Sequence, residues 1–300
     1  MSAKIVRNFI LAILILSSLF FLKPNYLSKE KVSPKEPFIR ELPFQISVNP
    51  LPKKIQGLPP PKLSAGASVV VDINSAKILY EKNKDIKLYP ASTTKIMTAL
   101  VANETFQENQ VFIVDKLIEG DQKNNFFRGE KILFKDLLKA LLLSSSNTAA
   151  EILARAHPLG REGFITDMNK KAKELSLKNT NFVNPTGFHD DNHYTTAYDL
   201  AFLAKKFGEN PELIKITSSK EEIVSNLERT YFHILKNTNT LVGKDGVLGI
   251  KTGWTEISRG ALTTLVNFRG NRIISVVLRS EDRFTDTEKL LAWTASTYRW

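Results

Sequence analysis

The chain has 300 residues, enough for one large domain or two small ones, and its 42% hydrophobic and 24% charged residues are the balance of a globular protein. It contains no cysteine, which excludes disulfides, thiolate metal sites and a cysteine nucleophile. The net charge of +11 suits anionic lipids or polymers, but the lysines and arginines are scattered, so we expect no nucleic-acid binding.

The first residues have the pattern of a targeting segment. Lys4 and Arg7 precede an uncharged apolar run from Phe9 to Leu22, which is long for a signal-peptide core and short for a full membrane span. No small-residue cleavage site follows. We therefore predict an N-terminal signal anchor over residues 1–22, with a cleaved signal peptide as the alternative. The basic residues before the run place the rest of the chain outside the cytoplasm.

Residues 23–64 are expected to form a linker. Most of the prolines of the chain lie here, ending in Pro59-Pro60-Pro61, with lysine and glutamate between them. This composition favours an extended chain of polyproline character. Residues 65–300 are then expected to form the globular domain.

The domain begins and ends with β patterns. Residues 68–73 and 77–81 flank a turn and predict a hairpin. Helical patterns dominate from 95 to about 215, and they predict helices over 134–143, 148–156, 164–175 and 197–207. β patterns return at 221–234, 246–254, 260–268 and 272–278, followed by an amphipathic helix at 284–298. Strands at both ends with helices between them predict an α+β domain whose mostly antiparallel sheet joins the two ends.

The sequence Pro90-Ala-Ser-Thr-Thr-Lys95 precedes an apolar run and predicts a helix start. Residues three apart on a helix project from one face, so Ser92 and Lys95 should be neighbours. A serine beside an amine that can take its proton is the minimal equipment for nucleophilic catalysis. The alternative is a serine cap followed by a solvated lysine, and Ser28 and Lys31 show that this spacing also arises by chance.

Two further polar motifs interrupt apolar surroundings. Ser145-Ser146-Asn147 separates two predicted helices, where a plain turn with capping residues is the simpler interpretation. Lys251-Thr252-Gly253 lies in a predicted strand, where a lysine often guards a sheet edge. The order Ser-x-x-Lys, Ser-x-Asn, Lys-Thr-Gly, with the last motif on a strand, is that of the active-site set of penicillin-recognising serine enzymes.

Residues 66–300 resemble the D-alanyl-D-alanine carboxypeptidases, the low-molecular-mass penicillin-binding proteins. The likeness is carried by residues 90–98, by 137–150, where the family more often has Gly at Ser146 and Asp at Thr148, and by 249–255. A block between the motifs also matches, at Met168, Asn169, Ala172, Leu175, Thr180, Phe182, Asn184, Pro185 and Gly187. The resemblance implies a β-lactamase/transpeptidase-like α+β fold, with a mostly antiparallel five-stranded sheet from both ends of the domain and a large helical insertion.

The resemblance also implies roles for residues. Ser92 is expected to be the acylated nucleophile and Lys95 its general base, with Ser145 and Asn147 completing the catalytic set. The substrate-binding residues implied are Lys251, Thr252, Gly253, Trp254 and, on position only, Arg283. A free lysine has a pKa near about 10.4. Lys95 therefore needs burial and nearby positive charge, such as that of Lys251, to lower its pKa.

The expected activity is that of a serine-type D-Ala-D-Ala carboxypeptidase, which removes the terminal D-alanine from peptidoglycan stem pentapeptides. β-Lactams are expected as covalent inhibitors, and no cofactor or metal is required. The expected location is the extracytoplasmic face of the bacterial cell membrane, or the exterior if the N-terminal segment is cleaved. A DD-endopeptidase, a β-lactamase and a non-catalytic wall-binding or sensor domain are the alternatives. The sequence around His189, Asp190, Asp191 and His193 is interpreted as a polar loop rather than a metal site.

Overall fold

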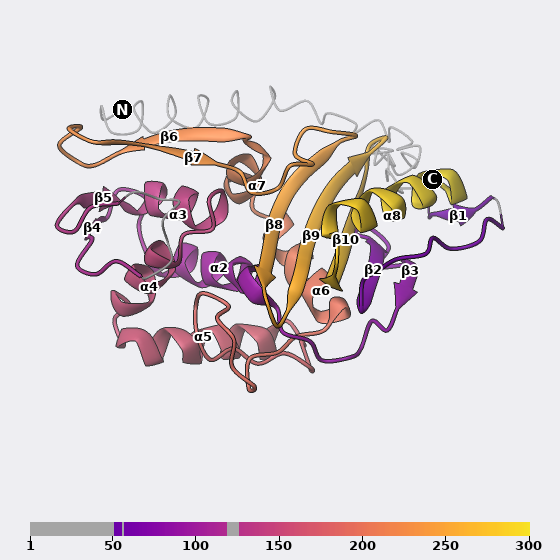
Figure 1. The fold of residues 1–300 in the computed structure, drawn as a ribbon, viewed down its shortest axis with the longest axis horizontal. Helices are drawn as coiled ribbons and strands as arrows, with labels where there is room; N and C mark the ends of the chain where they lie inside the picture. Colours follow the sequence, from indigo (N-terminus) through magenta and orange to yellow (C-terminus); the bar gives the residue numbers. More distant parts are fainter. Residues whose placement is uncertain (1–50, 56, 119–125) are drawn as a thin grey trace, which may run out of the picture. The chain divides into compact units, whose positions relative to one another are not determined.

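The framework of the domain is a five-stranded sheet in the order β3-β2-β10-β9-β8, seen in a computed structural model that describes residues 51–55, 57–118 and 126–300. All neighbouring strands are antiparallel. The strands are β2 (Ala67–Asp72), β3 (Ile78–Lys82), β8 (Val247–Thr255), β9 (Arg259–Phe268) and β10 (Asn271–Ser280). β2 from the start of the domain pairs directly with β10 from its end (Figure 1). The predicted α+β fold, with one sheet built from both ends, is confirmed.

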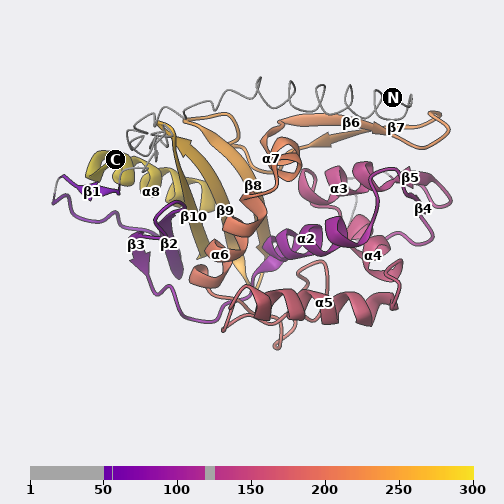
Figure 2. The ribbon, with the colours of Figure 1, turned by 180° about the vertical axis from the view of Figure 1, so that it is seen from behind.

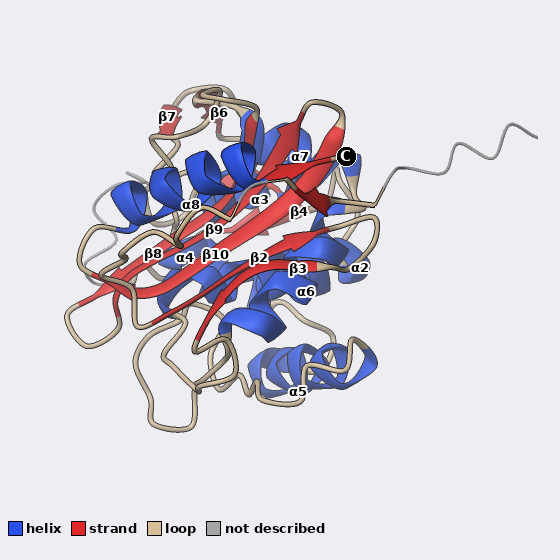
Figure 3. Ribbon diagram, turned by 90° about the vertical axis from the view of Figure 1, so that its right-hand side faces the viewer, coloured by secondary structure: helices blue, strands red, loops and turns tan. Residues whose placement is uncertain are grey.

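Both faces of the sheet are covered by helices (Figure 3). Val70 of β2 packs with Leu290 of α8 (Arg283–Thr297) on one face. Val69 and Val71 join the core beneath α2 (Lys95–Thr105) and α6 (Ala197–Gly208) on the other. Successive side chains of a strand point to opposite faces. A strand covered on both faces therefore reads as an unbroken apolar run, as residues 69–71 do.

The helical insertion lies between β3 and β8. Its elements are η1 (Ala91–Thr94), α2 (Lys95–Thr105), α3 (Phe134–Leu142), α4 (Asn147–Arg155), α5 (Gly160–Glu174), α6 (Ala197–Gly208) and α7 (Pro211–Ser218). Two small ribbons accompany them, β4 (Val111–Ile113) with β5 (Lys131–Leu133), and β6 (Glu221–Ser225) with β7 (Phe232–Lys236). α2 runs through the middle of the insertion, with α3 on one side and α5 on the other (Figures 1 and 2).

Most predicted elements are confirmed, and the differences have simple causes. The helix expected from residue 164 begins at Gly160. Strands β4 and β5 have three residues each, too few to show an alternating pattern. Helix α7 was not predicted, although Asn210 caps it and Pro211 occupies its first position, a known signal for a helix start.

The last part of the expected linker lies against the domain. β1 (Lys53–Lys54) pairs with β11 (Tyr298–Arg299), and the N–H groups of Ser64 and Ala65 donate to the Asp286 carboxylate of α8 at 3.1 and 2.8 Å. The expected anchor, residues 1–22, lies outside the described residues. Within the described ranges, every helix is too short or too polar to cross a membrane.

Candidate active site

Ser92 lies in the single turn of 3-10 helix η1, which leads directly into α2. Residues three apart eclipse one another in 3-10 geometry. Accordingly, Lys95 Nζ lies 3.1 Å from Ser92 Oγ, the contact that the sequence spacing predicts. Ala91, just before Ser92, has a φ of +48°. This conformation costs about 1–3 kcal/mol in a residue with a Cβ and often occurs at functional sites.

The Lys95 amine meets three oxygens from separate parts of the chain. Besides its contact with Ser92 Oγ, Nζ lies 2.7 Å from Asn147 Oδ1 and 2.9 Å from the carbonyl oxygen of Thr186. Asn147 is the first residue of α4, and Thr186 lies in the loop before α6. Lys95 itself is 0% exposed. The amine is thus enclosed and directed by its neighbours.

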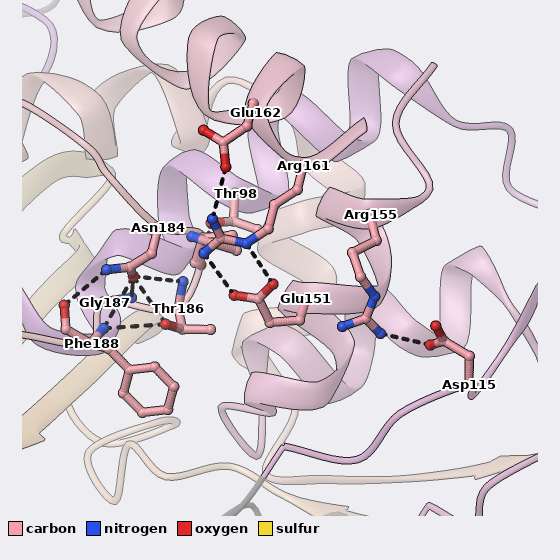
Figure 4. Close-up of polar contacts among 11 residues, drawn as sticks. Thr98, Asp115, Glu151, Arg155, Arg161, Glu162, Asn184, Thr186, Gly187 and Phe188 are labelled. Atoms are coloured by element: carbon pink, nitrogen blue, oxygen red, sulfur yellow. Dashed lines mark hydrogen bonds and ion pairs between the residues drawn. The ribbon is translucent and has the colours of Figure 1, made fainter. Parts of the chain in front are cut away.

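The loop at residues 184–188 is folded around the Asn184 side chain (Figure 4). Asn184 Oδ1 accepts from the N–H groups of Thr186, Gly187 and Phe188 at 3.2, 2.7 and 3.1 Å. The loop is fastened to α2, because Thr98 Oγ1 donates to the Pro185 carbonyl at 2.7 Å. A Cβ on Gly187, whose φ is +86°, would lie 1.9 Å from the carbonyl oxygen of Ala91. Only glycine permits this approach to the turn that carries Ser92.

The second motif forms the sharp turn between α3 and α4. Ser146 caps α4, accepting from Ala149 N at 3.0 Å, which accounts for a serine at a position where the family more often has glycine. Ser145 has a φ of +65°, and this left-handed conformation places it in the tightest part of the turn. α4 is clamped to α5 by the Arg161 guanidinium, which donates to both carboxylate oxygens of Glu151 at 2.9 and 3.2 Å (Figure 4). Asn147 is therefore presented by a firmly held helix.

The third motif lies on β8, the edge strand of the sheet. Lys251 and Thr252 are buried, with Lys251 Nζ donating to the Thr252 carbonyl at 3.0 Å, whereas the Trp254 residue is 59% exposed. A Cβ on Gly253 would lie 3.0 Å from Ser92 N. The strand therefore passes directly beside the turn that carries Ser92. The first half of its outer edge is instead covered by α7, where Thr217 Oγ1 donates to the Leu248 carbonyl at 3.1 Å.

Thr238 connects the second and third motifs. Its N–H donates to the Leu143 carbonyl at the end of α3 at 3.0 Å, and its Oγ1 lies 2.7 Å from Oγ1 of Thr252. One residue thereby fixes β8 relative to the turn that holds Ser145. Sequence reasoning missed Thr238, since it lies just after the β6–β7 ribbon and belongs to no motif.

Arg283 begins α8, and among the described residues no hydrogen bond, ion pair or ring contact joins its side chain to Ser92 or Lys95. The guanidinium is 4.6 Å from the centre of the Phe284 ring, and its Nε is buried without a hydrogen-bond partner among the described residues. Burial lowers the pKa of Arg283, an effect that the charge of Asp282 opposes. Arg283 stays a predicted substrate-binding residue.

The polar loop at 189–193 contacts the start of α2 through His193. His193 is buried, with Nε2 2.8 Å from Thr94 Oγ1 and Nδ1 accepting from Val183 N at 3.2 Å. Nε2 must then carry the proton and donate to Thr94. Burial lowers the pKa of His193 to about 4. In the part of the chain that the structure describes, no group of three or more His, Cys, Asp and Glu residues is arranged to hold a metal.

The sheet is built from both ends of the domain, a Ser-x-x-Lys pair lies at the start of the central helix, and a Lys-Thr-Gly strand lies beside it. This combination is characteristic of the penicillin-recognising serine enzymes. The D-alanyl-D-alanine carboxypeptidase family matches residues 54–282, and the chain belongs to that family.

Individual relatives include both carboxypeptidases and endopeptidases. D-alanyl-D-alanine carboxypeptidase DacF of Bacillus subtilis is 34% identical over 246 residues, covering 78% of this chain and 63% of DacF. The chain therefore spans less than two thirds of the length of DacF. D-alanyl-D-alanine endopeptidase of Escherichia coli is 31% identical over 242 residues, and the match covers 78% of this chain and 78% of the endopeptidase.

Solved structures agree with the fold. The Streptomyces K15 DD-transpeptidase has a TM-score of 0.75 at 25% identity, covering 80% of this chain and 100% of the transpeptidase. Penicillin-Binding Protein D2 from Listeria monocytogenes, in its ampicillin-bound form, has a TM-score of 0.70 at 29% identity, covering 79% of this chain and 99% of that protein.

Proposed function

We propose that the chain is a serine-type D-Ala-D-Ala carboxypeptidase that acts on peptidoglycan stem pentapeptides through an acyl-enzyme on Ser92. The observation that carries this proposal is the contact of a buried Lys95 amine with Ser92 Oγ, with Asn147 and Thr186 holding the amine from behind. Membership of the carboxypeptidase family supports it.

The count of N–H donors and lone pairs on the Lys95 amine supports its role as general base. A neutral amine has two N–H donors and one lone pair, whereas an ammonium has three donors. Asn147 Oδ1 and the Thr186 carbonyl are acceptors, so together they occupy both N–H groups of a neutral amine. The lone pair is then directed at Ser92 Oγ, 3.1 Å away, where it takes the hydroxyl proton as Oγ attacks.

The chemical step is acyl transfer. Ser92 Oγ bonds to the carbonyl carbon of the penultimate D-alanine, and the backbone N–H groups of Ser92 and Trp254 hold the oxyanion. The C–N bond breaks, and the terminal D-alanine leaves after its nitrogen receives a proton through Ser145. Water then attacks the ester, releasing the shortened peptide and restoring the Ser92 hydroxyl.

Substrate binding falls to β8 and its surroundings. The open part of the strand edge beside η1 suits an extended peptide that adds to the sheet through main-chain hydrogen bonds. Asn147 bonds the substrate amide, and Lys251 and Thr252, with Arg283 as a further candidate, bind the terminal carboxylate. β-Lactams occupy the same place and acylate Ser92.

The site of action is outside the cytoplasm, where peptidoglycan is found. We propose that residues 1–22 anchor the chain in the membrane, with secretion as the outcome if this segment is cleaved. Fractionation of cells that express the full chain tests this: the protein stays with membranes if anchored and is released if cleaved.

A DD-endopeptidase is the second candidate function. It is favoured by one observation, that the Escherichia coli endopeptidase is covered over 78% of its length, against 63% for DacF. The chemistry is the same acyl transfer, with a cross-linked peptide in place of D-alanine as the leaving group.

Mass spectrometry of purified peptidoglycan fragments, after incubation with the full chain, separates the two. Loss of one alanine from monomeric pentapeptides supports the carboxypeptidase. Conversion of cross-linked dimers to monomers with pentapeptides intact overturns it in favour of the endopeptidase. Unchanged fragments with rapid hydrolysis of penicillin identify a β-lactamase, and unchanged fragments without penicillin labelling identify a binding or sensor domain. Ser92→Ala serves as the control that should be inactive in all assays.

A further inference from the structure

Asn184 has an unusual number of contacts for one side chain of a surface loop. Its Oδ1 accepts from three backbone N–H groups of residues 186–188 and from Thr186 Oγ1 at 3.0 Å, and its Nδ2 donates to the Phe188 carbonyl at 3.0 Å. The carboxamide thus occupies the centre of the loop and is itself buried. Because these N–H groups all point inward to one oxygen, the side chain sets the orientation of the peptide groups around it (Figure 4).

The same peptide groups face the catalytic turn on their other side. In one peptide group, Gly187 N donates to Asn184 Oδ1 at 2.7 Å and the Thr186 carbonyl lies 2.9 Å from Lys95 Nζ. In the preceding peptide group, Thr186 N donates to Asn184 Oδ1 at 3.2 Å and the Pro185 carbonyl accepts from Thr98 Oγ1 at 2.7 Å. Gly187 lies against the Ala91 carbonyl without room for a Cβ. The loop is therefore held between Asn184 on one side and the Ser92–Lys95 turn on the other.

The Thr186 carbonyl is one of two oxygens that accept from the Lys95 amine, and in a neutral amine these bonds turn the lone pair toward Ser92. We propose that Asn184 is a positioning residue for the reaction: by orienting the Thr186 carbonyl, it directs the Lys95 lone pair at Ser92 Oγ. This inference rests on the proposed function of Lys95 as general base. Asn184 itself touches neither the amine nor the serine through any contact described above, so it acts through Thr186.

A substitution of Asn184 that adds a charge but keeps the shape of the side chain can distinguish a positioning role from a structural role. Asn184→Asp keeps the oxygen that accepts from residues 186–188, loses the donor to Phe188, and adds a negative charge two residues from the carbonyl that holds Lys95. A nearby negative charge favours the ammonium form of a lysine. The acidic limb of the acylation rate, where activity is lost as Lys95 is protonated, should then move up by about one pH unit.

Asn169 provides the matched control. Its Oδ1 accepts from Phe182 N at 2.9 Å and its Nδ2 donates to the Phe182 carbonyl at 2.7 Å, so it fastens the same stretch of chain to α5 two residues before Asn184. Asn169→Asp loses a comparable donor and adds the same charge farther along the chain from Thr186. If the substitutions only destabilise the loop and do not affect the Lys95 amine, both variants should change the acylation profile in the same way.

Other titratable groups around α2 are unchanged by these substitutions. They are His193 against Thr94, Lys251 on β8, the Glu151–Arg161 pair between α4 and α5, and Glu104, which pairs with Lys171 near the C-terminal end of α2. The difference between the two variants therefore reports on the charge at residue 184.

The experiment measures the second-order rate of acylation by a fluorescent penicillin from pH 5 to 10, for the full chain and both variants. We expect the acidic limb to move to higher pH in Asn184→Asp and to stay in place in Asn169→Asp. Coincident profiles for wild type and Asn184→Asp, or equal shifts in both variants, would overturn the inference. Failure of wild type to be acylated would instead contradict the proposed function.

A milder variant keeps the test valid if Asn184→Asp does not fold. Thr186→Val removes the hydroxyl bond to Asn184 and the bond that this hydroxyl accepts from Phe188 N at 3.2 Å, and it leaves the carbonyl in the chain. Loss of these two neutral hydrogen bonds, which steady the carbonyl, should slow acylation about threefold to tenfold at pH 7. Acylation at the wild-type rate, in a protein with a wild-type thermal midpoint, would overturn the inference.

Discussion

Gly253 of β8 and Ser92 of η1 lie so close that a single methyl group would not fit between them. A Cβ on Gly253 would be 3.0 Å from Ser92 N and 3.0 Å from Cβ of Ala91. Both neighbours belong to the turn itself, and Ala91 already has a positive φ. The edge of the sheet and the nucleophile turn therefore fix each other's position, and both N–H groups of the proposed oxyanion site depend on that contact.

Gly253→Ala should slow acylation of Ser92 about tenfold, because the added Cβ displaces the turn or the strand by a few tenths of an ångström and misaligns the reacting atoms. The second-order rate of acylation by penicillin measures this. Gly57→Ala is the control, since a Cβ there meets nothing within 4 Å. A Gly253→Ala enzyme that reacts at the wild-type rate would show that this close approach does not position the site.

Thr238→Val should weaken peptide hydrolysis about threefold to tenfold. The substitution removes the hydroxyl that lies 2.7 Å from Thr252 Oγ1, but keeps the N–H that bonds Leu143, so β8 stays in place while Thr252 loses its partner. The ratio kcat/KM for a D-Ala-D-Ala peptide is the measurement. Thr230→Val, which removes a hydroxyl bond to Asn226 within the β6–β7 turn, should leave the ratio unchanged. Equal losses in both variants would argue against a role for the Thr238–Thr252 contact in binding.

Stability should fall as pH decreases below about 6.5, in part because of His193. Burial lowers the folded-state pKa of His193 to about 4 from 6.5, so the unfolded chain takes up the proton first. The contribution is fully present above the unfolded pKa and is lost as pH falls toward the folded pKa, amounting to about 2 kcal/mol between pH 7.5 and pH 5. Urea unfolding of wild type and His193→Gln at both pH values measures it. The variant should lose less stability than wild type on acidification, and equal losses would contradict the assignment.

The sequence predicts the parts of the fold that depend on local patterns. The valine run in residues 68–73, the alternation in residues 77–81 and the apolar runs of β8–β10 are strong signals for strands. The spacing of Ser92 and Lys95 predicts their contact, because three-residue spacing brings side chains together in either helix type. Here the turn is 3-10 rather than α, a distinction that the residues do not encode locally.

Contacts made by backbone groups could not be predicted in this way. The pairing of Lys53 and Lys54 with the C-terminal strand has no signature, since two residues show no period. The Asn-Pro-Thr-Gly sequence at 184–187 indicates a turn, but nothing in it shows that the Thr186 carbonyl faces Lys95. The position of Thr238 likewise depends on tertiary packing, because its contact with Thr252 forms only when β8 lies near the end of α3.

Acylation of Ser92 is the step on which the proposed function depends most directly. The test is intact mass spectrometry of the full chain after incubation with ampicillin, followed by mapping of the modified peptide. The mass should rise by that of one ampicillin, the adduct should lie on the peptide that contains Ser92, and Ser92→Ala should acquire none. An adduct on another residue, or the same adduct in Ser92→Ala, would contradict the assignment of Ser92 as the nucleophile.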